Sequence, residues 1–169
     1  MKSSSQSSSH RKPVGGVRSV NLCAADNIAV AGFVDNATVC NQLEFVDDNA
    51  VMECMLLEDC SSFEERFSFD DGVVAVQHTL TLTADRNLAE AWLEPEFRNE
   101  SVAKGLCAIA TLNDGRTVLV GYSERFGASQ PLRISEIAVL SGCKLSDVPK
   151  ITMILDSFDT SPAAICAIN

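Results

Sequence analysis

Short apolar runs separated by turn-forming residues fill the chain from Val17 onward, and this pattern restricts it to a mainly β fold. The longest run, residues 73–83, alternates apolar with polar or small side chains, so one face of a strand is apolar and the other can meet water. Apolar runs at 104–112 and 116–122 flank Asn113-Asp114-Gly115, where Asp-Gly can supply the positive φ of a tight type I′ turn. The sequence therefore predicts a β-hairpin at 104–122.

The remaining apolar runs predict further strands and one helix. The strands are expected at 17–23, 39–46, 51–58, 62–69, 132–140 and 150–158. The helix is expected at about 84–93, where Leu88, Ala91 and Trp92 share one stripe and Pro95 ends the run. Together these elements predict a β-sandwich or a small β-barrel with one flanking α-helix.

The 169 residues fit one folded domain preceded by a short arm. Residues 1–16 are rich in serine and carry almost no apolar side chains, so we expect a disordered arm followed by a single β-rich domain at 17–169. No apolar run reaches the roughly 18 to 20 residues of a membrane helix, and the N-terminus has no apolar signal region. We expect a chain made in the cytoplasm with no membrane partner.

The formal net charge of −10 disfavours sequence-specific nucleic-acid binding through a basic surface. Most of the excess lies in residues 44–71, here called the acidic segment, where ten acids are opposed only by Arg66. Those acids are Glu44, Asp47, Asp48, Glu53, Glu58, Asp59, Glu64, Glu65, Asp70 and Asp71. Residues 1–20, in contrast, carry four bases and no acid. This polarity fits head-to-tail contacts between subunits, and it equally fits two solvated surfaces.

Cysteine usage and the absence of ligand-binding motifs argue against a cofactor or a metal. The seven cysteines are odd in number and irregularly spaced, which fits neither a disulfide framework nor a zinc site. Most lie within apolar stretches, so we interpret them as reduced core residues. The sequence contains neither of the glycine-rich phosphate-binding motifs.

His78 is the only histidine after the arm and lies on the apolar face of its predicted strand. We interpret it as a half-buried residue bonded to a neighbouring strand or loop. An enzyme using His78 with nearby carboxylates is a third hypothesis, after the two functions given at the end of this section. The acids at 46–50 and 69–72 are explained by turns rather than calcium loops, while a glycosidase pair of carboxylates stays open. Phe63, Phe67 and Phe69 are predicted to lie in the core.

Residues 104–162 resemble small structural proteins of phage and prophage tails or necks. The features in common are a β-hairpin around N-D-G-R, a V-G-Y-S-x-R-F-G loop, a Q-P-L-R segment before a strand, an S-G turn, and a last strand leading into D-S-F-D-T-S-P. The resemblance implies a tail-tube-like β domain with one flanking helix, assembled as rings through which DNA passes. The acidic segment would then supply lumen or interface charge, because a negative wall does not bind a polyanion.

The sequence thus predicts a non-enzymatic, self-assembling subunit of a phage or prophage tail or neck, without catalytic residues, cofactor or metal. Its partners would be copies of itself in a ring or tube and other virion proteins, and its final location would be the virion. The alternative is an intracellular acidic protein-binding module that stays monomeric or dimeric.

Overall fold

The computed structural model describes residues 15–168, which form eleven strands, one α-helix and three short 3-10 helices. The strands are β1 (Val17–Ala24), β2 (Ile28–Val34), β3 (Val39–Phe45), β4 (Met52–Cys54), β5 (Ser62–Asp70), β6 (Val73–Asp85), β7 (Leu106–Leu112), β8 (Thr117–Val120), β9 (Arg133–Leu140), β10 (Lys150–Asp159) and β11 (Ala164–Cys166). The helices are η1 (Ala25–Asn27), η2 (Asp48–Ala50), η3 (Glu90–Leu93) and α1 (Pro95–Lys104). The predicted disordered arm lies outside the described residues, apart from Gly15 and Gly16.

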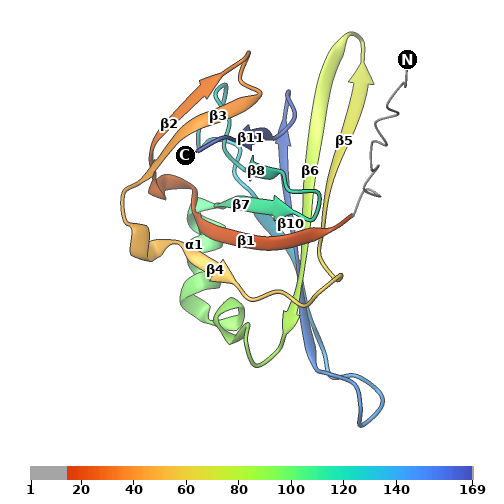
Figure 1. Cartoon of the computed structure of the whole chain (residues 1–169). Helices are drawn as coiled ribbons and strands as arrows, with labels where there is room; N and C mark the ends of the chain where they lie inside the picture. The colour runs from red at the N-terminus through yellow and green to blue at the C-terminus, as the bar shows by residue number, and fades with distance from the viewer. Residues whose placement is uncertain (1–14, 169) are drawn as a thin grey trace, which may run out of the picture.

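The strands form two sheets that face each other, with α1 at one side (Figure 1). The seven-stranded sheet has the order β2-β3-β11-β8-β7-β1-β4, and the four-stranded sheet has the order β5-β6-β10-β9. Every pairing is antiparallel except that of β11 with β3. The sheets do not close into a barrel. The predicted mainly β fold with one helix is confirmed, in its sandwich form.

The main core lies between the two sheets. Leu80 of β6 and Leu155 of β10 face Leu22 of β1 and Ala108 of β7, and all four are at most 1% exposed. Trp92 of η3 joins this cluster with 2% exposure. The helix α1 contacts both β1 and β9, so it packs against one strand of each sheet. The core therefore fixes the two sheets against each other.

A second apolar cluster lies on the opposite face of β7. It is formed with β2 and β3, the two strands at one end of the same seven-stranded sheet. Cys107 of β7, Cys23 of β1 and Cys40 of β3 are buried in it. Cys107 and Ala108 belong to different clusters because successive strand residues point to opposite faces. The prediction that most cysteines are core residues is confirmed for these three and for Cys54.

The two Asp-Gly pairs form different turns. In the β5–β6 hairpin, Asp71 and Gly72 have φ of 43° and 80°, as a two-residue type I′ turn requires. In the predicted β7–β8 hairpin, the Gly115 N–H donates to the Leu112 carbonyl and Gly115 has φ of 95°. This is a three-residue loop with a bulge at the glycine. The hairpin is confirmed, and the type I′ turn predicted there is wrong.

The helix is not at 84–93 as predicted. Strand β6 continues to Asp85, because Ala84 and Asp85 pair with the first residues of β10. Pro95 begins α1 instead of ending a helix, since its fixed φ suits the first helical position. Within the predicted stripe Trp92 is buried, but Leu88 is 61% exposed. The apolar spacing of Leu88, Ala91 and Trp92 therefore does not mark one face of a helix, and Trp92 is the residue of the three that packs into the core.

Three short segments also differ from the prediction. The strand predicted at 51–58 forms only at β4, and β2 and β11 were not predicted. β11 has three residues, too few for a recognisable alternation, and it exists because β3 and β8 pair with it on either side. The other predicted strands are confirmed to within two residues at each end.

The four-stranded sheet extends beyond the sandwich at both ends (Figure 1). At one end the β5–β6 hairpin projects, and at the other end the β9–β10 connection, residues 141–149, projects in the opposite direction. We call these the hairpin arm, residues 66–76, and the distal loop, residues 141–149. They place exposed apolar side chains at opposite ends of one sheet.

Gly121→Ala should destabilise the fold more than Gly115→Ala. Both glycines have positive φ, 85° and 95°, which costs an L-residue about 1–2 kcal/mol. A Cβ on Gly121 would also lie 2.6 Å from the Leu106 carbonyl oxygen, whereas a Cβ on Gly115 meets open space. Urea unfolding of both variants measures the difference. An equal or smaller loss of unfolding free energy at Gly121 would contradict this account.

Candidate functional site

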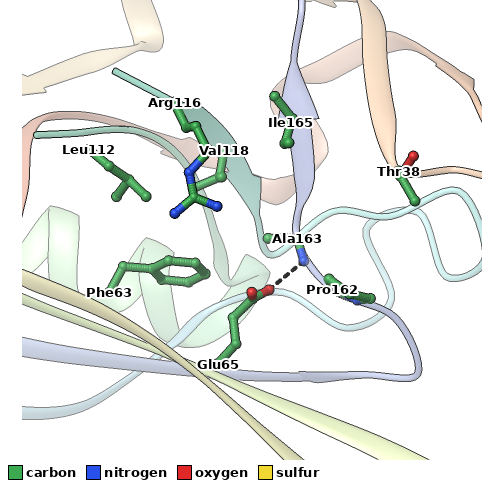
Figure 2. Close-up of a pocket in the computed structure, with 9 residues that line it drawn as sticks. All are labelled: Thr38, Phe63, Glu65, Leu112, Arg116, Val118, Pro162, Ala163 and Ile165. Carbon is green, nitrogen blue, oxygen red and sulfur yellow. Dashed lines mark hydrogen bonds between the residues drawn. The ribbon is translucent and has the colours of Figure 1, made fainter. Parts of the chain in front are cut away.

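A pocket of about 290 Å³ opens between the two sheets near the base of the hairpin arm (Figure 2). It is lined by β5, the β7–β8 hairpin, the end of the β2–β3 turn, β11 and the connection from β10 to β11. The lining residues are Thr38, Phe63, Glu65, Leu112, Arg116, Val118, Pro162, Ala163 and Ile165. Both sheets therefore contribute to one concave surface.

Glu65 is the carboxylate of this pocket. Its Oε1 accepts a hydrogen bond from the Ala163 N–H at 2.6 Å and lies 3.3 Å from Nε2 of His78. Glu65 stands directly opposite His78 in the β5–β6 pairing, so both side chains leave the same face of the sheet. Ala163 comes immediately before β11 of the other sheet. The carboxylate therefore links the two sheets beside the pocket (Figure 2).

Burial alone would raise the pKa of the Glu65 carboxyl. The nearby His78 ring, the hydrogen bond from the Ala163 N–H and the positive charge of Arg116 outweigh burial and hold that pKa below its ordinary value. Glu65 is therefore ionised at neutral pH. Its negative charge lies at the inner end of the pocket, and the Glu65 side chain is 27% exposed.

His78 lies behind Glu65, buried to 3% exposure. Its Nδ1 is 3.5 Å from Oγ of Ser157 on β10. Its Nε2 is within ion-pair distance of Glu65, but it is not aligned for a hydrogen bond and has no such partner among residues 15–168. The predicted contact with a neighbouring strand is present, but the ring is fully buried rather than half-buried.

Ser157, His78 and Glu65 form a row that superficially matches a nucleophile, a base and an acid. Ser157 is 3% exposed on the inner face of the sheet, so a substrate carbonyl has no approach to its hydroxyl. The 3.5 Å separation from His78 is also long for an activated hydroxyl. The row is better explained as a polar network that holds β5, β6 and β10 together.

Arg116 provides the positive charge at the rim of the pocket. Its guanidinium binds Asp114 through two contacts of 2.7 and 2.8 Å, and this pairing raises the pKa of Arg116 and lowers that of Asp114. Between Arg116 and Glu65 the walls are apolar, formed by Phe63, Val118 and other side chains. The pocket therefore has apolar walls, a carboxylate at its inner end and at its rim a guanidinium that is already paired with Asp114.

The ten acids of the acidic segment do not form one surface. Glu64, Glu65, Asp70 and Asp71 lie on β5 and its turn, at the edge of the four-stranded sheet. The others lie on or near β3 and β4, which occupy separate positions in the seven-stranded sheet. Glu65 is half-buried and the other nine are exposed. Of these ten acids only Glu65 contributes to the pocket, and the turns expected within 46–50 and 69–72 are present, at η2 and at Asp71-Gly72.

The buried thiols are poor nucleophiles. Burial raises the pKa of Cys23 to about 11 and that of Cys54 to about 12, and it raises the pKa of Cys107 as well. Protonated thiols neither attack electrophiles nor bind metals readily. Cys60 and Cys143 are exposed, on the segment before β5 and in the distal loop.

Sequence reasoning named Glu65 as one acid among ten and missed Phe63, Arg116 and Ala163 as its companions. One signal for the Glu65–His78 pair was present. A two-residue turn at Asp71-Gly72 pairs Asp70 with Val73 and, five residues further along each strand, Glu65 with His78. The Ala163 contact had no such signal, because it joins residues 98 positions apart.

Comparisons with protein-family models, curated proteins and solved structures find no match to this chain. Among residues 15–168, no helix is long and apolar enough to cross a membrane. The same residues contain no group of three or more histidine, cysteine, aspartate or glutamate side chains arranged to hold a metal ion.

Glu65→Gln should lower the free energy of unfolding at neutral pH and should make that free energy less dependent on pH in the acidic range. Because the folded-state pKa of Glu65 is lowered, its ionised form stabilises the fold above the unfolded pKa, about 4.5, and this contribution is lost as pH falls through the folded value. Urea unfolding from pH 7 down to pH 3 should show the two proteins converging in acid. Glu64→Gln, on the opposite face of β5, is the control. A constant difference between wild type and Glu65→Gln across the whole range would contradict the linkage.

Native protein should expose two thiols that react rapidly with a chromogenic disulfide reagent, Cys60 and Cys143. The four buried thiols should react only after unfolding, because burial both shields them and keeps them protonated, and the half-buried Cys166, whose pKa is also raised, should react slowly. Thiol titration with and without urea measures both numbers. A Cys60→Ser, Cys143→Ser double variant should abolish the rapid phase, and a persisting rapid phase would contradict the buried positions.

Proposed function

We propose that the chain is a non-enzymatic structural subunit that associates with copies of itself in a phage or prophage tail or neck. The observation that carries the proposal is the hairpin arm, which projects from the sandwich with exposed apolar side chains. Phe67, Phe69 and Val73 are 44%, 77% and 65% exposed. Large apolar groups gathered on a projecting element mark a surface that another molecule covers.

The exposed aromatics continue the core-facing side of β5. Phe63, Glu65, Phe67 and Phe69 alternate along the strand and share one face. Phe63 packs against the core, as predicted, but Phe67 and Phe69 are exposed on the hairpin arm, which projects beyond the facing sheet (Figure 1). Their predicted burial is therefore wrong for the isolated chain, since the opposing strands do not extend far enough to cover them.

A second copy of the chain is the occupant that the charges favour. Residues 62–72 carry four acids and one base. At the other end of the same sheet, residues 140–150 carry two bases and one acid. Complementary surfaces at opposite ends of a subunit join copies head to tail, which produces rings or tubes rather than closed dimers. Within the described chain β5 and β9 are also edge strands, available to extend the sheet.

The tail or neck setting is supported by the resemblance of residues 104–162. The N-D-G-R motif forms the β7–β8 hairpin, the S-G turn follows β9, and the D-S-F-D segment ends β10. Nine exposed acids on several edges of the domain would suit a conduit for DNA, because like charge keeps a polyanion off the wall. A phage or prophage assembly therefore remains the setting we propose.

We expect the full-length protein to form oligomers whose mass increases with protein concentration. A Phe67→Ser, Phe69→Ser double variant should weaken this association by about tenfold or more, since burying one aromatic side chain stabilises a contact by about 1.5–3 kcal/mol. Multi-angle light scattering at several concentrations, with negative-stain images of the same fractions, measures the effect.

Val102→Ser is the matched control, because Val102 is 74% exposed on α1 and lies outside the arm. This variant should assemble as the wild type does. A wild-type chain that stays monomeric at every concentration would contradict self-assembly and favour the acidic protein-binding module.

A further inference from the structure

The distal loop displays a leucine entirely to solvent on an ordered backbone. Leu145 has a fractional exposure of 109%. Around it, Oδ2 of Asp147 accepts hydrogen bonds from the N–H groups of Cys143 and Lys144, both at 2.9 Å. The Asp147 N–H donates to the Lys144 carbonyl at 3.0 Å. The loop is thus held in one shape before any partner arrives, which lowers the entropic cost of binding.

Leu145 is also the tip of an apolar group. Leu140 and Val148 flank the loop with exposures of 53% and 47%. A scattered exposed leucine is ordinary on a protein surface, but three such side chains on one projecting loop form a contact surface. Lys144, directly beside the leucine, adds a positive charge.

The pocket at the other end of the sheet complements this loop. Its apolar walls include Phe63, Val118 and Ile165, and its inner carboxylate is Glu65. A cavity of about 150 Å³ can hold a benzene molecule, so a pocket of about 290 Å³ has room for a leucine side chain. Glu65 is the one acid of the acidic segment that lines the pocket, so a lysine next to an inserted leucine would meet its negative charge.

The loop and the pocket cannot meet within one molecule. The loop precedes β10 and the pocket residues Pro162 and Ala163 follow it, so they lie at opposite ends of a ten-residue strand. At about 3.4 Å per residue that separation is on the order of 30 Å. Any contact between them joins two copies.

We infer that the distal loop of one copy inserts Leu145 into the pocket between Phe63, Glu65 and Val118 of the next copy. The positive charge of Lys144 then lies near the carboxylate of Glu65, and the exposed aromatics of the arm cover the rest of the loop. Each subunit then uses its loop on one neighbour and its pocket on another, so association is head to tail. This inference rests on the proposed self-assembly and names the surfaces that carry it.

Two single variants and their mixture test the inference. Leu145→Asp removes the inserted side chain, and Thr38→Trp fills the pocket from its exposed rim. Each alone should weaken self-association by about tenfold or more, the loss expected for one buried leucine. Mixed in equal amounts, they should form a one-to-one pair, because one variant keeps an intact pocket and the other an intact Leu145. Sedimentation velocity should show the pair stopping at two subunits.

Leu88→Asp and Leu88→Trp are the matched controls. Leu88 is 61% exposed on the segment after β6 and belongs neither to the pocket nor to the distal loop, so the two variants introduce the same side chains at a neutral position. Both should assemble as the wild type does, and thermal unfolding of all four variants confirms that they fold. If Leu145→Asp and Thr38→Trp assemble as the wild type does, or fail to pair in the mixture, the inference falls while self-assembly stands. A wild-type monomer at every concentration overturns both.

Discussion

Strand β6 pairs with β5 on one side and β10 on the other, and the core, the pocket and the hairpin arm all follow from this pairing. β6 has thirteen residues, and its inner side chains from Val76 to Ala84 are fully or almost fully buried. The type I′ turn at Asp71-Gly72 fixes the register with β5, and the register with β10 follows along the other edge. A shift of one residue would turn the apolar set outward, so this register is strongly specified.

A mismatch in strand length between the two sheets produces the functional surfaces. The strands at the centre of the four-stranded sheet have thirteen and ten residues, whereas β8 and β11 opposite have four and three. The longer sheet therefore extends past the shorter one, leaving the aromatics of the hairpin arm without a facing layer and opening the pocket beneath them. The surface proposed for association is the part of the core side that the fold itself does not cover.

The polar network around His78 has a mechanical role in this arrangement. Glu65 is kept ionised by the N–H of Ala163 and by nearby positive charge, so it holds the chain leading to β11 against β5. Breaking such a contact is costly because it leaves a charged group partly buried without its donor. The same carboxylate places negative charge inside the pocket. Glu65 therefore contributes both to the stability of the fold and to the proposed recognition between copies.

Alternation and turn residues act over a few neighbouring positions, so the sequence predicted the mainly β class, most strand positions and the core positions of most thiols. It misplaced the helix, since Pro95 can either end or begin one, and it placed Phe67 and Phe69 in a core that stops short of them. It also predicted a half-buried His78, which is fully buried. Which of ten acids lines a pocket, and that the loop bearing Leu145 lies opposite it, emerged only from the packing of the folded chain. Those facts depend on contacts between distant segments, such as Glu65 with Ala163, and on the unequal lengths of two sheets, which no local pattern records.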